Sequence, residues 1–169
     1  MMGYGPKYTV PYKRKKQNKT DYRKRLALLK SRMPRLAARK TNKRIIAQII
    51  TFAPEGDKTI ISVSSRDLKK YGLAVDANNT PIAYLTGYLL GKSAINKKIK
   101  KAVFDLGLNI ATKGNKLYAV LKGAADAGIE IPHSEEVMPS AERLAGAHIK
   151  NFDTAMVEKI KNNIDSKVK

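Results

Sequence analysis

The stretch RLAARKTNKRIIAQIITFAPEGDKTIISV, residues 35–63, carries the clearest strand pattern of this 169-residue chain. Small and aliphatic residues alternate with arginines over 35–39, and a run rich in isoleucine follows at 45–52 after a turn-like segment. A Pro- and Gly-containing turn at 53–57 leads to a further β-rich run at 59–63. The stretch therefore predicts a meander of three antiparallel strands.

Helical patterns follow the meander. A short helical turn is expected after Ser64 or Ser65, and Thr80 is expected to cap a longer helix with Pro81 at its first position. Two glycines four residues apart in that helix are expected to permit close packing on the sheet. The main apolar face of the helix is formed by Ile82, Leu85 and Leu89, and the two glycines are Gly87 and Gly91.

A strand and a helix complete the predicted body. Apolar residues over 102–106 form a compact buried strand that stops at Gly107, and residues 117–125 repeat at helical spacing. Ile129 and Ile131 add a short edge strand. The predicted fold is α/β (α+β sandwich-like), with a mixed sheet, β-β-β-α-β-α order and helices packed on the sheet.

Three segments divide the chain. Residues 1–34 are predicted to be a basic RNA-binding extension, in which Asp21 or Thr20 caps a short helix, because this segment has too few large aliphatic side chains to bury a core alone. Residues 35–131 are the globular α/β body, and 132–169 form a helical C-terminal tail. The tail is expected to contain a short helix around 140–147 and a terminal helix carrying Met156, Ile160 and Ile164 at four-residue steps.

Positive charge is concentrated at one end of the chain. The first 44 residues hold sixteen Lys or Arg against a single acid, Asp21, within a total net charge of +20. A polyanion is the partner that such an asymmetry favours, and nucleic acid is the first to consider. The alternative is a solvated basic tail that aids solubility or acts as a targeting signal.

Aromatic residues within this basic end indicate RNA with unpaired bases. Cations neutralise phosphates, while tyrosines stack on bases that are not paired. The tyrosines are Tyr4, Tyr8, Tyr12 and Tyr22. The predicted hairpin extends the basic surface, since Arg35 and Arg39 share one strand face and further cations surround Thr41 and Asn42 at the turn. An ordinary exposed strand face is the alternative.

Other site types have weaker support. Cysteine is absent, and two histidines without partners at ligand spacing, His133 and His148, make a poor metal site. Asp105, Asp126 and Glu130 raise the alternative of a basic RNA-processing nuclease, although solvated or capping carboxylates are the preferred interpretation. No phosphate-cradling motif, cofactor, secretory signal or membrane span is predicted, and a cytoplasmic location is expected. A DNA-architectural protein is a second alternative, because charge alone does not distinguish DNA from RNA.

Several segments in order resemble one known family. KTDYRKRLALLKSRMPRLAARKTNKRIIAQII (19–50) resembles the start of the universal large-subunit ribosomal protein L-eighteen family, the 5S rRNA-binding protein, in its archaeal form. PIAYLTGYLLG (81–91), VFDLGLN (103–109) and GAADAGIEIPH (123–133) are similar to its body, and GAHI (146–149) to its C-terminal part. The resemblance covers the chain up to about residue 152.

The resemblance implies a structural, non-catalytic protein of the large ribosomal subunit. Its implied partners are 5S rRNA, the large-subunit (23S) rRNA and neighbouring large-subunit ribosomal proteins, with attachment of 5S rRNA in the central protuberance. Bacterial members usually carry Asp-Arg-Gly-Gly after the buried strand, where this chain has DLGLN at 105–109, so no arginine role transfers there. The implied RNA contacts are Lys7, Tyr8, Tyr12, Lys13, Arg14, Lys15, Lys19, Thr20, Tyr22, Arg23, Arg25, Arg32, Arg35, Arg39, Lys40, Thr41, Asn42 and Lys43.

Overall fold

A four-stranded mixed sheet organises the molecule. The computed structural model describes residues 5–6, 8–73, 78–150 and 152–168. The strands are β1 (Arg35–Lys40), β2 (Ile45–Thr51), β3 (Lys58–Ser64) and β4 (Val103–Asp105). Their order is β3-β2-β1-β4, in which β1–β2 and β2–β3 are antiparallel and β1–β4 is parallel. The predicted meander and the mixed sheet are confirmed.

The two faces of this sheet differ in chemistry. Leu36 pairs with Ile49 and Ala38 with Ala47 in the β1–β2 register, and all four side chains are fully buried in the hydrophobic core. Successive side chains in a strand point to opposite faces, so the residues of β1 that alternate with Leu36 and Ala38 project from the other face of the sheet. Those residues are Arg35, Ala37 and Arg39.

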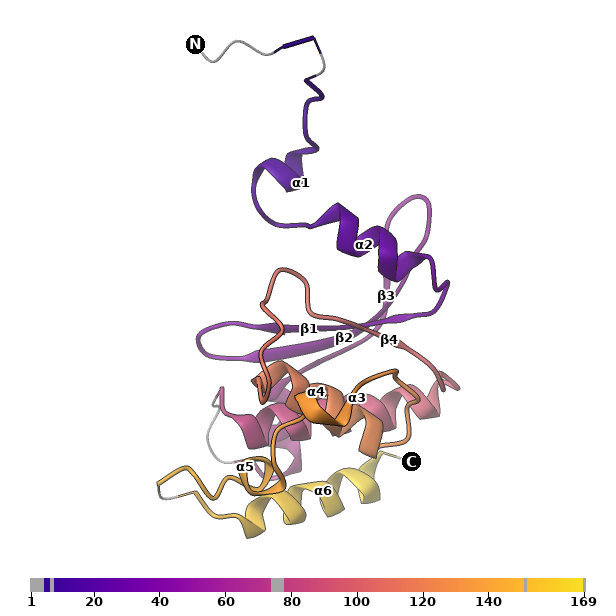
Figure 1. Cartoon of the computed structure of the whole chain (residues 1–169). Coiled ribbons are helices and arrows are strands. Elements are labelled where there is room, and N and C mark those ends of the chain that lie inside the picture. Colours follow the sequence, from indigo (N-terminus) through magenta and orange to yellow (C-terminus); the bar gives the residue numbers. More distant parts are fainter. Residues whose placement is uncertain (1–4, 7, 74–77, 151, 169) are drawn as a thin grey trace.

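Helices cover the apolar face. A 3₁₀ helix, η1 (Ser65–Tyr71), follows β3 and ends at Gly72, whose φ of 104° is a left-handed conformation that glycine adopts without strain. The long helix α3 (Thr80–Asn96) and then α4 (Lys116–Asp126) pack beneath the sheet (Figure 1). The predicted cap of α3 is displaced by one residue, because the Asn79 side chain accepts the hydrogen bond from the Ile82 amide at 3.1 Å and Thr80 is already helical.

The glycines of α3 serve helix-to-helix packing rather than helix-to-sheet packing. A Cβ on Gly87 would lie 2.0 Å from the Val120 carbonyl oxygen of α4, and a Cβ on Gly91 would lie 2.4 Å from the Ala127 Cβ. On α4, a Cβ on Gly123 would lie 2.1 Å from the Tyr84 carbonyl oxygen. The close approach of two helix backbones therefore requires residues without side chains, and the expectation of packing on the sheet was wrong about the partner.

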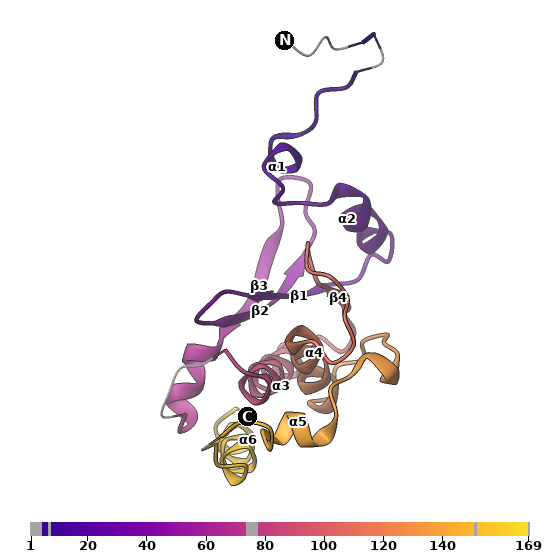
Figure 2. The same ribbon diagram turned by 60° about the vertical axis from the view of Figure 1, so that its left-hand side comes forward.

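The C-terminal segment packs on the body. It contains η2 (Glu135–Val137), α5 (Ala141–Ala145) and α6 (Ala155–Lys167). Ile160 and Ile164 of α6 are buried in the same core as α3, and the Tyr88 hydroxyl donates to Asp165 at 2.9 Å. Figure 2 shows α6 as the layer farthest from the sheet, with α3 and α4 between.

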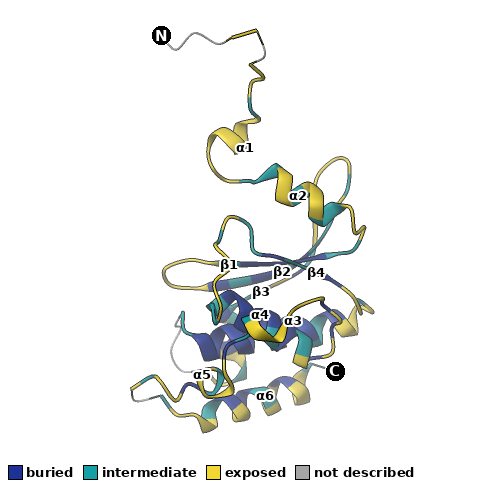
Figure 3. Cartoon of the chain, in the orientation of Figure 1, coloured by how far each residue is buried: buried dark blue, intermediate teal, exposed yellow. Residues whose placement is uncertain are grey.

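The N-terminal extension lies on the opposite side of the sheet. It contains one helical turn, α1 (Lys13–Lys16), and the predicted helix α2 (Tyr22–Leu29), neither of which has a buried residue. Figure 3 shows mostly exposed residues in this segment and a buried layer of helix beneath the sheet. The extension therefore has no core of its own, as its composition predicted.

One predicted element is absent from the described residues. Instead of an edge strand at 129–131, a single parallel bridge joins Lys101 to Glu130. The following Pro132 has no N–H with which to extend the pairing. None of the described helices has both the length and the apolar character needed to span a membrane.

Candidate nucleic-acid interface

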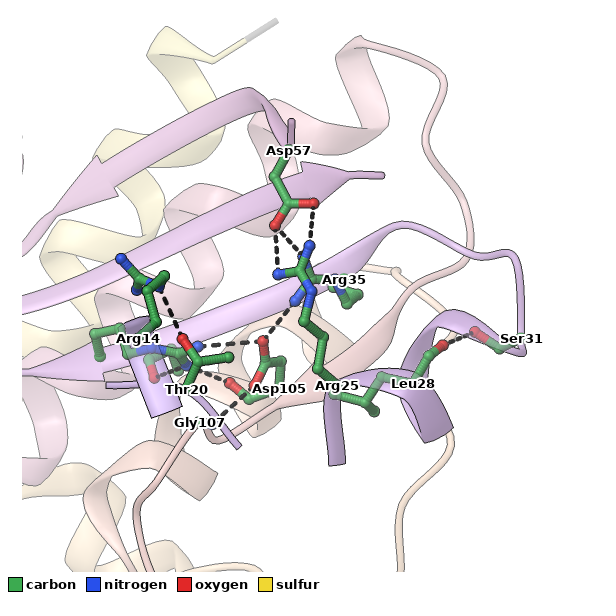
Figure 4. Close-up of polar contacts among 11 residues, drawn as sticks. Arg14, Thr20, Arg25, Leu28, Ser31, Arg35, Asp57, Asp105 and Gly107 are labelled. Carbon is green, nitrogen blue, oxygen red and sulfur yellow. Dashed lines mark hydrogen bonds and ion pairs between the residues drawn. The ribbon is translucent and has the colours of Figure 1, made fainter. Parts of the chain in front are cut away.

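The open face of the sheet carries a buried arginine. Arg35 is only 4% exposed, and its guanidinium donates to Asp105 Oδ2 at 3.0 Å and to Asp57 Oδ2 at 2.6 Å (Figure 4). The register explains the first pair, because Ala37 of β1 lies opposite Asp105 of β4, which sets this carboxylate between Arg35 and Arg39. A buried cation requires such partners, since an unpaired one is strongly disfavoured.

Asp105 is fully engaged by its neighbours. Arg39 donates to its Oδ2 at 3.1 Å and to its backbone oxygen at 2.7 Å, and the Gly107 amide donates to its Oδ1 at 2.7 Å. Gly107 has φ +63°, and a Cβ there would lie 2.9 Å from Arg39 Cζ, so both the turn and the close arginine require glycine. Asp105 is 6% exposed, and its interpretation as a solvated or capping carboxylate was wrong, because it pairs with two arginines.

Asp57 joins the extension to the body. Arg25 of α2 donates to both carboxylate oxygens of Asp57, each at 2.8 Å, across 32 residues of sequence. The Arg25 hydrogen bond holds the pKa of Asp57 below its usual value against the opposing effect of burial, and Arg35 contributes in the same direction. The same hydrogen bond raises the pKa of Arg25. We call Arg25, Asp57, Arg35, Asp105 and Arg39 the arginine–aspartate chain.

Local sequence explains how α2 presents its cations. The Asp21 carboxylate accepts hydrogen bonds from the amides of Arg23 at 3.0 Å and Lys24 at 3.2 Å, which fixes the first turn of α2. The ring of Tyr22 lies 5.0 Å from that of Tyr12, the residue before α1. The two short helices of the extension are thus linked through aromatic side chains.

A cavity of about 230 Å³ lies between the extension and the open sheet face. The arginine–aspartate chain contributes part of its lining, and the extension contributes Arg14, Lys19 and Lys24. Arg14 donates from Nε to the Thr20 hydroxyl at 2.9 Å. Within the described residues none of these three cations forms an ion pair, so their positive charge is uncompensated by contact.

The structure separates the predicted RNA contacts into three groups. The residues of the first group are exposed: Tyr8, Tyr12, Lys13, Arg14, Lys15, Lys19, Arg23, Arg32, Lys40, Thr41, Asn42 and Lys43. Those of the second are half-buried: Thr20, Tyr22, Arg25 and Arg39. Arg35 alone is buried, so the expected exposed basic face is interrupted there, and Lys7 lies outside the described residues, as does Tyr4.

Some polar groups of the β1–β2 turn form hydrogen bonds within the protein. The Thr41 hydroxyl accepts from the Arg44 amide at 3.0 Å and donates to the Arg44 carbonyl oxygen at 3.1 Å. The Thr41 carbonyl oxygen accepts a hydrogen bond from the Asn78 side chain. Thr41 therefore shapes the turn, while Lys40, Asn42 and Lys43 are exposed around it.

Sequence reasoning missed Lys24 and Asp57. Lys24 lies within the basic run at 23–25, and that run was the available signal. The sequence pattern predicts a turn at Asp57, and nothing in its immediate sequence indicates partners 32 and 22 residues away.

The other acidic candidates are separated from one another. Asp126 accepts from the Tyr84 hydroxyl at 2.9 Å and pairs with Lys122, while Glu130 pairs with Lys101 at 3.0 Å. No group of three His, Cys, Asp or Glu side chains with metal-binding geometry occurs among the residues that the structure describes. His133 and His148 are both exposed.

Comparison with known proteins gives a consistent result. The family model for ribosomal large subunit proteins 60S L5 and 50S L18 matches residues 6–103 and 95–134. The large ribosomal subunit protein uL18 of Halobacterium salinarum is 46% identical over 157 residues, covering 93% of this chain and 86% of the relative. The uL18 proteins of Haloferax volcanii and Natronomonas pharaonis are 50% and 48% identical, each over 89% of this chain and 82% of the relative. These relatives are archaeal.

Proposed function

The chain belongs to the family of ribosomal large subunit proteins 60S L5 and 50S L18, and from that premise we propose that it binds 5S rRNA and helps to attach it to the large-subunit (23S) rRNA in the central protuberance. Within this family it is a structural constituent of the large subunit of the cytoplasmic ribosome and not an enzyme. It therefore associates with rRNA and with other ribosomal proteins.

The proposal rests on the exposed cations of the extension. Lys13, Lys15, Lys19 and Arg23 are exposed, and none forms an ion pair within the described part of the chain. Cations without acidic partners are free to neutralise phosphates and to release the counterions condensed on RNA. If about six to ten phosphates are neutralised, the logarithm of the binding constant falls with the logarithm of salt concentration with a slope of about −5 to −9.

The tyrosines supply a contact that is independent of salt. Tyr12 is 72% exposed although its ring centroid lies 5.0 Å from that of Tyr22, so its ring is accessible to an unpaired base. Stacking of one base on an aromatic side chain contributes about 1–3 kcal/mol. A folded RNA with loops offers such bases, whereas a regular duplex keeps them stacked within the helix.

Arg35 of the arginine–aspartate chain has a different part in this proposal from Arg25 and Arg39. Arg35 is buried on the open face of the sheet and holds the two carboxylates, while Arg25 and Arg39 are half-buried. We assign the direct RNA contacts to the exposed and half-buried predicted residues, and a supporting role to Arg35.

Competition binding tests the proposed function. Binding to 5S rRNA is measured at near-physiological salt with excess transfer RNA as competitor, for the full chain and for a chain lacking residues 1–34. The expected result is that transfer RNA fails to displace 5S rRNA from the full chain and that the shortened chain loses this preference. Equal competition by transfer RNA, or by duplex DNA of the same length, would leave only general polyanion binding and would contradict the proposal.

A further inference from the structure

Three acidic residues line the cavity of a surface that attracts a polyanion, and one of them, Asp21, caps α2. Asp57 and Asp105 both face the cavity beneath the extension, where each carboxylate lowers the positive potential that RNA experiences. Asp105 is explained by the burial of Arg35, for which it is a necessary partner. Asp57 also pairs with Arg35, but it lies in the exposed β2–β3 turn and is the carboxylate that Arg25 of α2 contacts, so it requires a separate explanation.

Asp57 is held rigidly from the body side. Arg35 belongs to a central strand, is buried, and is fixed by Asp105 as well as by Asp57. Its 2.6 Å hydrogen bond to Asp57 Oδ2 orients that carboxylate. The two oxygens of Asp57 are thereby presented as a fixed acceptor pair that matches the forked guanidinium of Arg25.

The extension depends on this contact. Within the described residues, Arg25–Asp57 is the single ion pair that joins residues 5–34 to the rest of the chain. Apolar packing gives α2 little support, because Leu26 is 59% exposed and Leu28 and Leu29 are only half-buried. An isolated helix of eight residues is not stable in water, so α2 needs a fixed attachment to keep its place.

We propose that Asp57 is a positioning residue for RNA binding: it fastens α2 to the sheet through Arg25, so that the exposed cations of the extension are ordered before RNA arrives. The role deepens the RNA-binding function proposed above and rests on it. Ordering in advance favours binding because less conformational entropy is lost when the complex forms. Asp57 then strengthens binding although its own charge repels phosphate.

The turn that carries Asp57 offers a matched control. Glu55 lies two residues earlier, is exposed, and forms no ion pair within the described residues. Asp57→Asn and Glu55→Gln each remove one negative charge from the same turn. Long-range electrostatics predicts that both changes leave RNA binding equal or slightly tighter. The positioning role predicts that Asp57→Asn weakens RNA binding, whereas Glu55→Gln does not.

The experiment compares the full-length chain with Asp57→Asn, Glu55→Gln and the conservative variant Asp57→Glu. Affinity for 5S rRNA is measured at fixed salt, and amide exchange of residues 22–29 is measured without RNA. We expect Asp57→Asn to weaken binding about twofold to fivefold, the scale of one partly exposed ion pair, and to remove amide protection from α2. Glu55→Gln is expected to lower neither the RNA affinity nor the amide protection of α2. Asp57→Glu is expected to recover part of the affinity and part of the protection.

Opposite results overturn the positioning role. Asp57→Asn that binds as tightly as Glu55→Gln, or that retains the protection of α2, would show that the ion pair does not order the extension for RNA. Unchanged exchange in β1 and β2 verifies that the body of each variant is folded. Failure of the unmodified chain to prefer 5S rRNA over transfer RNA would instead contradict the proposed function, and the exchange of α2 still tests the ion pair without any RNA.

Discussion

The two faces of the sheet bury their residues by opposite means. Leu36 is 0% exposed and Arg35, its neighbour in β1, is 4% exposed, yet they lie on different faces. Leu36 is covered by the hydrophobic core beneath the sheet, whereas Arg35 is covered by two carboxylates and by the extension. Equal burial therefore has two causes, and only the first follows from hydrophobicity.

The difference shows how the protein separates stability from binding. The helix-covered face joins the sheet, α3, α4 and α6 into one core. On the open face Arg25, Arg35 and Arg39 are paired with Asp57 and Asp105. Arg14, Lys19 and Lys24 of the extension line the same cavity and form no ion pair within the described residues. Removing a carboxylate from the open face should therefore disturb both the fold and the cation array, while changes on the apolar face should disturb the fold alone.

The largest expected effect is that of Asp105→Asn. Arg35 would remain buried with Asp57 as its remaining carboxylate, and breaking a buried pair lowers the free energy of unfolding by about 3–5 kcal/mol. Denaturant unfolding measures this change. Leu36→Ala, a cavity mutation on the other face, should cost about 2–5 kcal/mol, so the loss alone does not separate the two causes. Adding Arg35→Met should recover stability in Asp105→Asn and not in Leu36→Ala, and recovery in neither would contradict the ion-pair account.

Next in size is the replacement of a glycine between the two central helices. Gly87→Ala introduces a Cβ that would lie 2.0 Å from the Val120 carbonyl oxygen, so α3 and α4 must move apart. Overpacking of this kind costs about 1–3 kcal/mol. Alanine favours a helix interior over glycine by about 1 kcal/mol, so a net loss of stability in Gly87→Ala reports the clash with α4. Binding of RNA by the folded fraction of Gly87→Ala should be unchanged. A change in the salt dependence of its RNA binding would show that packing on the apolar face affects the cations on the open face.

A smaller effect separates two neighbouring arginines of α2. Arg23 is exposed, while Arg25 is held by Asp57. Arg23→Ala should reduce the magnitude of the salt slope of RNA binding by about one unit, because one phosphate contact is lost. Arg25→Ala should in addition abolish the protection of the α2 amides. The measurements are binding constants across a salt series and amide exchange without RNA. Identical behaviour of the two variants would contradict the assignment of Arg25, but not Arg23, to holding α2 on the sheet.

The smallest expected effect is a pH dependence of the attachment of α2. The pKa of Asp57 in the folded protein lies below its ordinary value of 3.8, because Arg25 and then Arg35 stabilise its charged form. Both arginines facing it stay charged, so the stabilisation is complete above about pH 4 and is lost as pH falls through the lowered pKa. A partly exposed pair contributes at most about 1 kcal/mol. Amide exchange of α2 should be insensitive to this contact between pH 7 and pH 5, and loss of protection already at pH 5 would contradict the assigned pKa direction.

Local patterns in the sequence predicted most of the elements. The alternation over 35–39, the isoleucine run and the turn at 53–57 correspond to β1, β2 and the turn before β3. Asp21 caps α2 as expected, because a carboxylate one residue before a helix satisfies its free amides locally. The prediction of an edge strand at 129–131 was wrong. A strand needs a partner strand to pair with, and here only a single bridge to Lys101 forms.

The candidate site was predictable in composition but not in geometry. The sequence indicated that the cations of the first 44 residues face a polyanion, and most of the predicted contacts are exposed. It did not indicate that Arg35 is buried on the open face by two carboxylates or that Asp57 holds Arg25. The distances along the chain explain why: Arg35 meets Asp57 and Asp105 across 22 and 70 residues, and no periodic pattern reports such pairs.

By itself, the sequence determined the strand and helix periods, the cap of α2, the lack of a core in the extension and the sign of the partner's charge. Each of these depends on neighbouring residues or on a sum over residues. The folded arrangement is needed to see which of the described cations are paired with carboxylates, which glycines meet which helix, and that α6 packs on its own body. Those outcomes depend on which distant side chains come within a few ångströms of one another, and that is set by the folded arrangement of the strands and helices.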